Sequence, residues 1–120
     1  MLITVDRTSV AAGDDALPHV RSVDVSPETP LAEVVAGLLA DHFLATVAGG
    51  RATWIVTAGE EWLGVVAQQW DRPRYLVDAT RPVSSFASLG SGATLLFRYR
   101  KQHDPEEVLA ELAAGRHPRR

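Results

Sequence analysis

Four histidines, His19, His42, His103 and His117, are the first candidates for metal binding or acid–base chemistry in this chain. None is followed by another histidine at the four-residue spacing that places two imidazoles on one helix face. The chain also has no cysteine, which excludes thiolate-bound zinc, iron–sulfur clusters, disulfides and thiol catalysis. We therefore expect no metal site and no cofactor.

Adjacent polar side chains are the next candidates for catalysis. Asp14–Asp15 and Glu60–Glu61 are neighbouring carboxylates, but neighbouring residues on a strand point to opposite faces. Ser84–Ser85 lacks the frame of a nucleophile elbow, and Gly90 and Gly92 lack the helix and lysine of a phosphate loop. The spacing of these residues in the sequence identifies no nucleophile with a base and an orienting group. We therefore expect a protein that is not an enzyme.

Three tryptophans recur every eight residues, at Trp54, Trp62 and Trp70. One interpretation is that they cover the sheet as core or rim residues. The other is that at least one anchors a partner, because tryptophan is enriched among binding hot spots. Trp70 lies between Gln68–Gln69 and Asp71–Arg72, the most polar surroundings of the three, and we expect it to be exposed.

The elements that position these residues follow from the spacing of apolar side chains. Alternation predicts strands from Met1 to Val5 and from Val20 to Val25. From Leu31 the apolar period becomes helical, which predicts a helix to about residue 42, capped by Thr29 with Pro30 in its first turn. We expect the helix residues Leu31, Val35, Leu38 and Leu39 to pack on the strand residues Ile3, Val5, Val23, Val25, Leu95 and Phe97.

The sequence pattern in the second half of the chain predicts further strands and one more helix. Residues 52–78 predict two or three short strands, with Gly64 marking a bulge or a weak edge. A connector over residues 78–93, anchored by Val83, Phe86 and Leu89, leads to a final strand over residues 94–100.

The C-terminal segment carries clear helix signals. Asp104 is a suitable cap, Pro105 suits the first turn, and Gly115 supplies a stop. A helix of about eleven residues is too short to persist alone in water. Its apolar stripe of Val108, Leu109 and Leu112 must therefore dock on the rest of the chain or on a second copy.

This order of elements resembles the α+β ubiquitin-like β-grasp fold, in which a mixed sheet packs on one main helix. The residues that carry the resemblance are Met1–Val5, Val25–Leu31, Trp54–Gly59, Val83–Phe86, Leu89, Gly92 and Thr94–Arg98. Residues 1–103 are thus expected to form this domain, and residues 104–120 a C-terminal helix and tail. Residues 60–77 are longer than the corresponding family region, which predicts an extra strand or hairpin.

The ending Arg119–Arg120 departs from the Gly-Gly tail of conjugated ubiquitin-like modifiers and sulfur carriers, and Gly49–Gly50 is internal. The resemblance therefore implies non-covalent binding rather than conjugation. Small bacterial members of this kind occur as accessory or docking components of larger assemblies, including secretion systems. We expect such a non-catalytic protein-interaction module here.

The even-numbered face of the final strand is the predicted binding surface. If Leu95 and Phe97 face the helix, the neighbouring residues on the strand face outward, because strand side chains alternate. An apolar centre bordered by cations suits a protein partner with acidic groups. The predicted binding residues are Leu96, Arg98 and Arg100, with Ile55 or Trp54 enlarging the patch and Trp70 as the next candidate.

Charge and hydropathy narrow the other function classes. The net charge is −3, and no nucleic-acid motif is present, so we expect no nucleic acid as a partner. No apolar run approaches the ~20 residues of a membrane span, and no signal peptide is recognisable, so we expect a cytoplasmic protein without membrane insertion. The sequence leaves open whether the chain forms a homodimer.

The alternative function is a small α+β enzyme or ligand-binding domain, which a pocket with converging Asp, Glu or His would favour.

Overall fold

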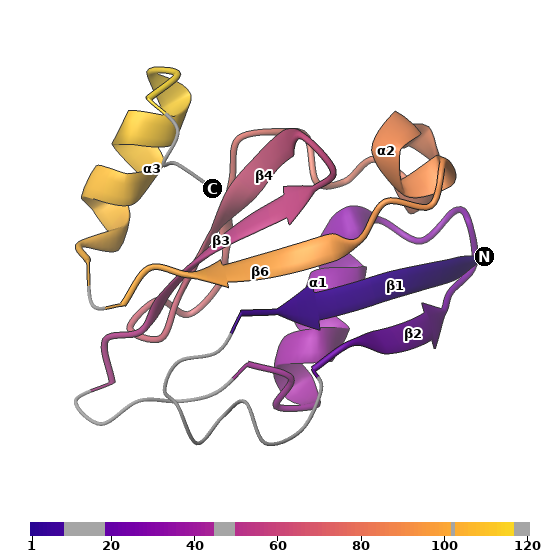
Figure 1. The fold of residues 1–120 in the computed structure, drawn as a ribbon, viewed down its shortest axis with the longest axis horizontal. Helices are drawn as coiled ribbons and strands as arrows, with labels where there is room; N and C mark the ends of the chain where they lie inside the picture. The colour runs from indigo at the N-terminus through magenta and orange to yellow at the C-terminus, as the bar shows by residue number, and fades with distance from the viewer. Residues whose placement is uncertain (9–18, 45–49, 102, 117–120) are drawn as a thin grey trace.

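A computed structural model describes residues 1–8, 19–44, 50–101 and 103–116. Within these residues the chain is an α+β protein with one six-stranded mixed sheet in the order β2-β1-β6-β3-β4-β5 (Figure 1). Strands β1 and β6 pair in parallel, and all other neighbours are antiparallel. The strands are β1 (Leu2–Arg7), β2 (Arg21–Asp24), β3 (Thr53–Ala58), β4 (Glu61–Ala67), β5 (Arg74–Tyr75) and β6 (Leu95–Tyr99), and the helices are α1 (Leu31–Ala40), α2 (Ala87–Gly90) and α3 (Pro105–Ala113).

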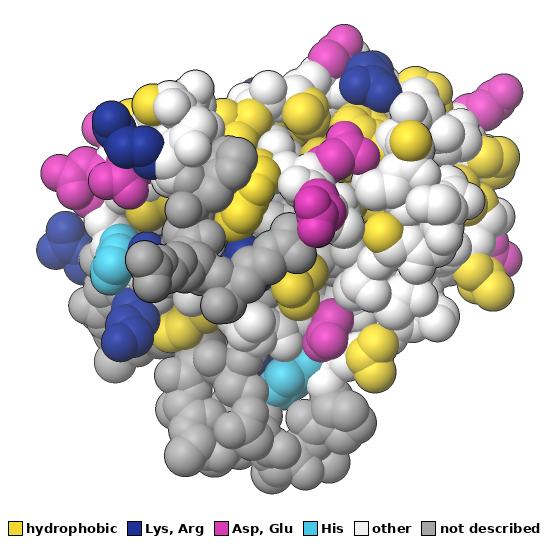
Figure 2. Space-filling view, turned by 45° about the horizontal axis from the view of Figure 1, so that its top comes forward, with side chains coloured by type: hydrophobic (Ala, Val, Ile, Leu, Met, Phe, Trp, Pro, Cys, Tyr) yellow, Lys and Arg dark blue, Asp and Glu magenta, His cyan; other side chains and the backbone are white. Residues whose placement is uncertain are grey.

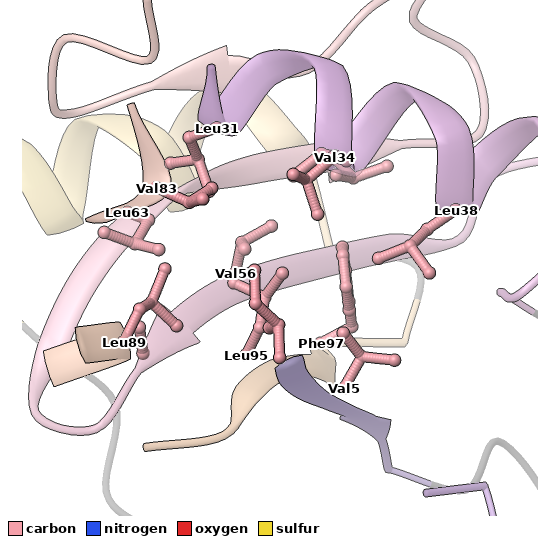
Figure 3. Packing of buried hydrophobic residues seen from close by; sticks show 14 of the residues in the cluster. Val5, Leu31, Val34, Leu38, Val56, Leu63, Val83, Leu89, Leu95 and Phe97 are labelled. Carbon is pink, nitrogen blue, oxygen red and sulfur yellow. The ribbon is translucent and has the colours of Figure 1, made fainter. Parts of the chain in front are cut away.

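Helix α1 lies across one face of the sheet, and the main hydrophobic core fills the space between them (Figure 3). The predicted core assignment is confirmed. Its members Leu31, Val35, Leu38, Ile3, Val5, Leu95 and Phe97 are buried, and Leu39, Val23 and Val25 are half-buried against the same cluster. The connector anchors Val83, Phe86 and Leu89 are buried there as well.

The start of α1 differs from the prediction that Thr29 caps it, since no side chain caps this helix. Instead, the backbone N–H groups of Leu31 and Ala32 donate to the carbonyl oxygens of Arg81 and Ala79, at 3.1 and 3.0 Å. The connector therefore satisfies backbone donors that a helix leaves open at its N-terminus. A segment distant in sequence has taken the role expected of a local side chain.

Residues 52–78 form three strands, and the extra hairpin predicted there is β4 with β5. The pairing of β3 with β4 shifts register, since Val56 pairs with Gly64 whereas Thr57 pairs with Trp62. Leu63 is thus an additional residue on β4, and the bulge predicted beside Gly64 is confirmed.

The side chain of Tyr75 on β5 packs against the main core, and its hydroxyl oxygen is buried with no hydrogen-bond partner among the described residues. A buried hydroxyl without a partner costs free energy. Tyr75→Phe is therefore expected to raise the free energy of unfolding by about 0.5–2 kcal/mol at neutral pH. Urea denaturation measures this change, and a loss of stability in the variant contradicts the expectation.

The pH dependence gives a second readout at Tyr75. Burial raises the pKa of its phenol from 10.0 to about 12. The unfolded chain therefore releases this proton at lower pH than the folded chain. As a result, the free energy of unfolding falls as the pH rises from 10.0 to about 12. The Tyr75→Phe variant is expected to lack this contribution, so the stabilities of the two proteins diverge further above pH 10.

Helix α3 packs on the opposite face of the sheet from α1, over β3 and β4. The Asp104 carboxylate accepts the backbone N–H of Glu106 at 3.0 Å, which confirms the predicted cap. Val108 and Leu112 are buried against Ile55 and Val65 of the sheet. Of the two predicted docking modes, the structure therefore shows α3 on its own chain. Among the described residues, no helix combines the length and apolar character needed to cross a membrane.

Candidate binding surface on the sheet

The face of the sheet opposite α1 is only half covered. Helix α3 lies over β3 and β4, whereas β1, β2 and β6 have no described helix in front of them (Figure 1). We call this uncovered half the open face, defined by Leu2, Thr4 and Asp6 on β1 and by Leu96 and Arg98 on β6. Its orientation follows from alternation, because Ile3, Val5, Leu95 and Phe97 point into the α1 core.

Leu96 and Arg98 border a shallow hollow of about 180 Å³ together with Thr57 and Gly59. Leu96 is opposite Thr57 in the pairing of β6 with β3, and the Thr57 hydroxyl donates to the Leu96 carbonyl oxygen at 3.5 Å. Gly59 closes the hollow at the β3–β4 turn, where its φ of +58° favours glycine. The hollow is therefore framed by the backbone of β3 and β6 and by the β3–β4 turn.

Arg98 is positioned by an aromatic side chain two strands away. Its guanidinium carbon lies 5.2 Å from the ring centroid of Trp62 on β4. The arginine thus extends across β3 and rests on an indole face, an arrangement that holds a guanidinium by cation–π attraction. Both side chains are half-buried, so the charge is held near the surface beside the hollow.

The charges around Leu96 have both signs. Asp6 on β1 is its register neighbour, and Arg98 is the next residue on the same side of β6. The apolar side chain therefore lies between a carboxylate and a guanidinium, rather than beside two arginines as predicted. Leu2, on the same face at the beginning of β1, is 72% exposed and adds apolar surface.

Arg100 is not part of the open face. Although it continues the alternation of Leu96 and Arg98, it follows the end of β6 and lines a hollow of about 360 Å³ beside α3. Its Nε is buried and has no partner among the described residues. The other ionisable residues around this hollow are His103, Asp104, Glu107, Glu111 and Arg116. Figure 2 shows basic, acidic and histidine side chains gathered on the side where α3 lies.

The prediction that Ile55 or Trp54 enlarges an exposed patch is wrong. Ile55 is 0% exposed because α3 covers it, and Trp54 is 2% exposed because it points into the α1 core. Strand β3 is buried on both faces along its whole length. Apart from Thr57, which lines the hollow beside Leu96, its side chains are not available to a partner.

Trp70 is half-buried and lies apart from the open face. The guanidinium carbon of Arg74 is 4.4 Å from its ring centroid, and the Arg74 Nη1 pairs with the Glu106 carboxylate of α3 at 3.5 Å. Trp70 also lines a separate hollow near the end of α1. Of the predicted binding residues, only Leu96 and Arg98 therefore share one site.

Sequence reasoning missed Asp6, Thr57, Gly59 and Trp62 as neighbours of Leu96 and Arg98. These residues come together only through strand order, and no local spacing signals them. The carboxylates beside Arg100 did carry a signal, because Glu107 and Glu111 share one face of a helix at the spacing i, i+4 and Asp104 is the cap of that helix. In the described part of the chain, no group of three or more His, Asp or Glu side chains is arranged to hold a metal.

The adjacent carboxylates Glu60 and Glu61 lie in the β3–β4 turn and at the start of β4. Glu61 accepts a hydrogen bond from the Ser88 hydroxyl at 2.6 Å, which ties β4 to α2. Asp14–Asp15 lies outside the described residues, as do His117 and the end of the 104–120 segment. The described site thus contains binding groups, namely an apolar hollow, a held guanidinium and a carboxylate.

Comparison with known proteins added no identification. No protein-family model, curated protein sequence or solved structure matched the chain.

Proposed function

We propose that this chain is a non-catalytic protein-interaction module with a ubiquitin-like β-grasp fold. Support for the fold comes from the central parallel pair of β1 with β6, the flanking antiparallel strands and α1 lying across one face. Strand β5 and helix α3 are additions to that plan. The module acts in the cytoplasm as an accessory or docking component of a larger assembly, such as a secretion system.

The observation that carries the binding function is the hollow on the open face. A partner's apolar side chain enters the hollow beside Leu96, and a carboxylate of the partner pairs with the guanidinium of Arg98. The arginine is already held on Trp62, so little side-chain freedom is lost when the pair forms. Arginine is one of the residue types enriched among those that dominate binding energy.

Two charge-introducing variants test this surface. The native partner is first identified by photocrosslinking from position 96 in the host, and its affinity is then measured by calorimetry. Leu96→Asp and Arg98→Glu are each expected to weaken binding about tenfold or more, since a hot-spot residue contributes more than 1 kcal/mol. Both positions are half-buried at the surface, and circular dichroism verifies that the variants remain folded.

The matched control is a charge reversal away from the open face. Glu28 is exposed and precedes α1, so Glu28→Arg is expected to leave the affinity unchanged. Unchanged affinity in both Leu96→Asp and Arg98→Glu removes the open face from the binding function. Sedimentation of the free protein separately tests whether the partner is a second copy of the chain.

A ligand-binding domain or small enzyme is the second candidate, and the hollow beside α3 is the observation that favours it. His103, Glu107 and Glu111 converge there with Arg100. The first three are exposed on the helix side of the hollow, whereas acid–base catalysis is assisted by groups shielded from water. The open face therefore supports the first function better.

A further inference from the structure

A third hollow, distinct from the open face and from the one beside α3, lies where α1 and β4 end. Its volume is about 160 Å³. The floor is apolar and is formed by Leu39, Leu44, Trp54 and Val66, and Trp70 forms part of the wall. We call this hollow the Trp70 pocket.

The volume of the Trp70 pocket matches a ligand with one aromatic ring. A protein cavity of about 150 Å³ lined by aliphatic and aromatic side chains binds benzene, and the Trp70 pocket is about as large. Trp54 and Trp70 both line the pocket, so the part of each indole that borders it is aromatic surface on which a ring can pack. The apolar part of a fitting ligand is therefore a single six-membered aromatic ring.

The rim of the pocket carries two opposite charges. Asp71 and Arg72 follow Trp70 directly, line the pocket and are exposed. His42, which follows the end of α1, lies on the same rim. A guanidinium binds a carboxylate through paired hydrogen bonds, and a carboxylate accepts from an ammonium group. A ligand that matches both rim charges carries one group of each sign.

We infer that the Trp70 pocket binds a free aromatic amino acid of the phenylalanine type. The ring occupies the floor between Trp54 and Trp70, the α-carboxylate binds Arg72, and the α-ammonium group binds Asp71. This site shares no lining residue with the hollow beside Leu96 and Arg98, so the inference goes beyond the proposed function. Either can fail while the other holds.

The expected affinity follows from the same contacts. Burial of one aromatic ring corresponds to a dissociation constant on the order of 1 mM. Charge-assisted hydrogen bonds at the rim tighten this about tenfold. A dissociation constant between about 0.1 and 1 mM suits a free metabolite and is accessible to titration by NMR.

The test uses the full chain labelled with ¹⁵N at its indole nitrogens. L-phenylalanine is expected to shift the indole signals of Trp54 and Trp70 and to leave that of Trp62, which does not line the pocket, unchanged. L-alanine, a zwitterion without a ring, is expected to shift neither. N-acetyl-L-phenylalaninamide, a ring without charges, is expected to bind about tenfold more weakly than L-phenylalanine.

Substitutions at the rim of the pocket test the contribution of each charge to binding separately. Arg72→Gln and Asp71→Asn are each expected to weaken L-phenylalanine binding at least about threefold while leaving binding of the neutral amide unchanged. Arg51→Gln is the matched control, because Arg51 is exposed and does not line the pocket. Leu44→Trp, which fills the pocket from a half-buried position, is expected to abolish binding of both probes.

Three results overturn the inference. One is the absence of shifts at Trp54 and Trp70 up to about ten times the expected dissociation constant. Another is equal affinity for L-phenylalanine and its neutral amide, which means that the rim charges play no part. The third is equal affinity for L-phenylalanine and L-phenylalaninamide, which retains only the ammonium group and represents the N-terminus of a polypeptide.

Discussion

Replacing Leu38 with alanine is expected to lower the free energy of unfolding by about 2–5 kcal/mol, the range found when a buried leucine is truncated. Leu38 is 3% exposed and points from α1 toward the sheet, as Figure 3 shows. The loss combines the apolar surface returned to water with the cavity left behind, since the neighbouring strands cannot fully collapse into it. Urea denaturation monitored by circular dichroism measures the change.

The same chain provides the matched control for this truncation. Leu2 is 72% exposed on the open face, so Leu2→Ala is expected to change stability by no more than about 0.5 kcal/mol. Comparable losses in the two variants contradict the assignment of Leu38 to the core. A selective loss in Leu38→Ala ties the fold to the packing of α1 on the sheet.

The elements that local periodicity specifies are the ones that could be predicted. The stripe from Leu31 predicted α1, and the alternation around Leu95 and Phe97 predicted which face of β6 is buried. In each case the residues that give the pattern are close in sequence. The cap of α1 could not be predicted in the same way, because Arg81 and Ala79 reach it from a distant connector.

The burial of Ile55 could have been predicted from the sequence. Residues 53–58 carry apolar or β-branched side chains at consecutive positions, and such a run is typical of a strand covered on both faces. With α1 assigned to one face, the C-terminal helix was available to cover the other. Helix α3 supplies this second layer and covers Ile55.

The candidate site was only partly predictable because it combines residues from four strands. Alternation placed Leu96 and Arg98 on one side of β6. The contact of Arg98 with Trp62 depends on β3 lying between β6 and β4, and the proximity of Asp6 depends on the parallel pairing of β1 with β6. Strand order is a property of the whole fold that no short motif carries.

Replacing Gly64 with alanine is expected to destabilise the protein by roughly 3 kcal/mol, at the upper end of overpacking costs. A Cβ atom at this position would lie 2.5 Å from the carbonyl oxygen of Arg74 and 3.0 Å from the Cα of Tyr75. Both are backbone atoms of β5, so no side-chain rotation relieves the clash. Strand β5 must move away from β4, which breaks their hydrogen bonds and disturbs Tyr75.

The matched control for Gly64→Ala is the same substitution on α1. Gly37 is exposed, and a Cβ atom there meets nothing within 4 Å. Alanine is favoured over glycine inside a helix, so Gly37→Ala is expected to raise the free energy of unfolding by about 0.5–1 kcal/mol. Denaturation curves of the two variants should therefore move in opposite directions from the parent protein. A Gly64→Ala variant as stable as the parent would show that β5 does not pack tightly against the bulge of β4.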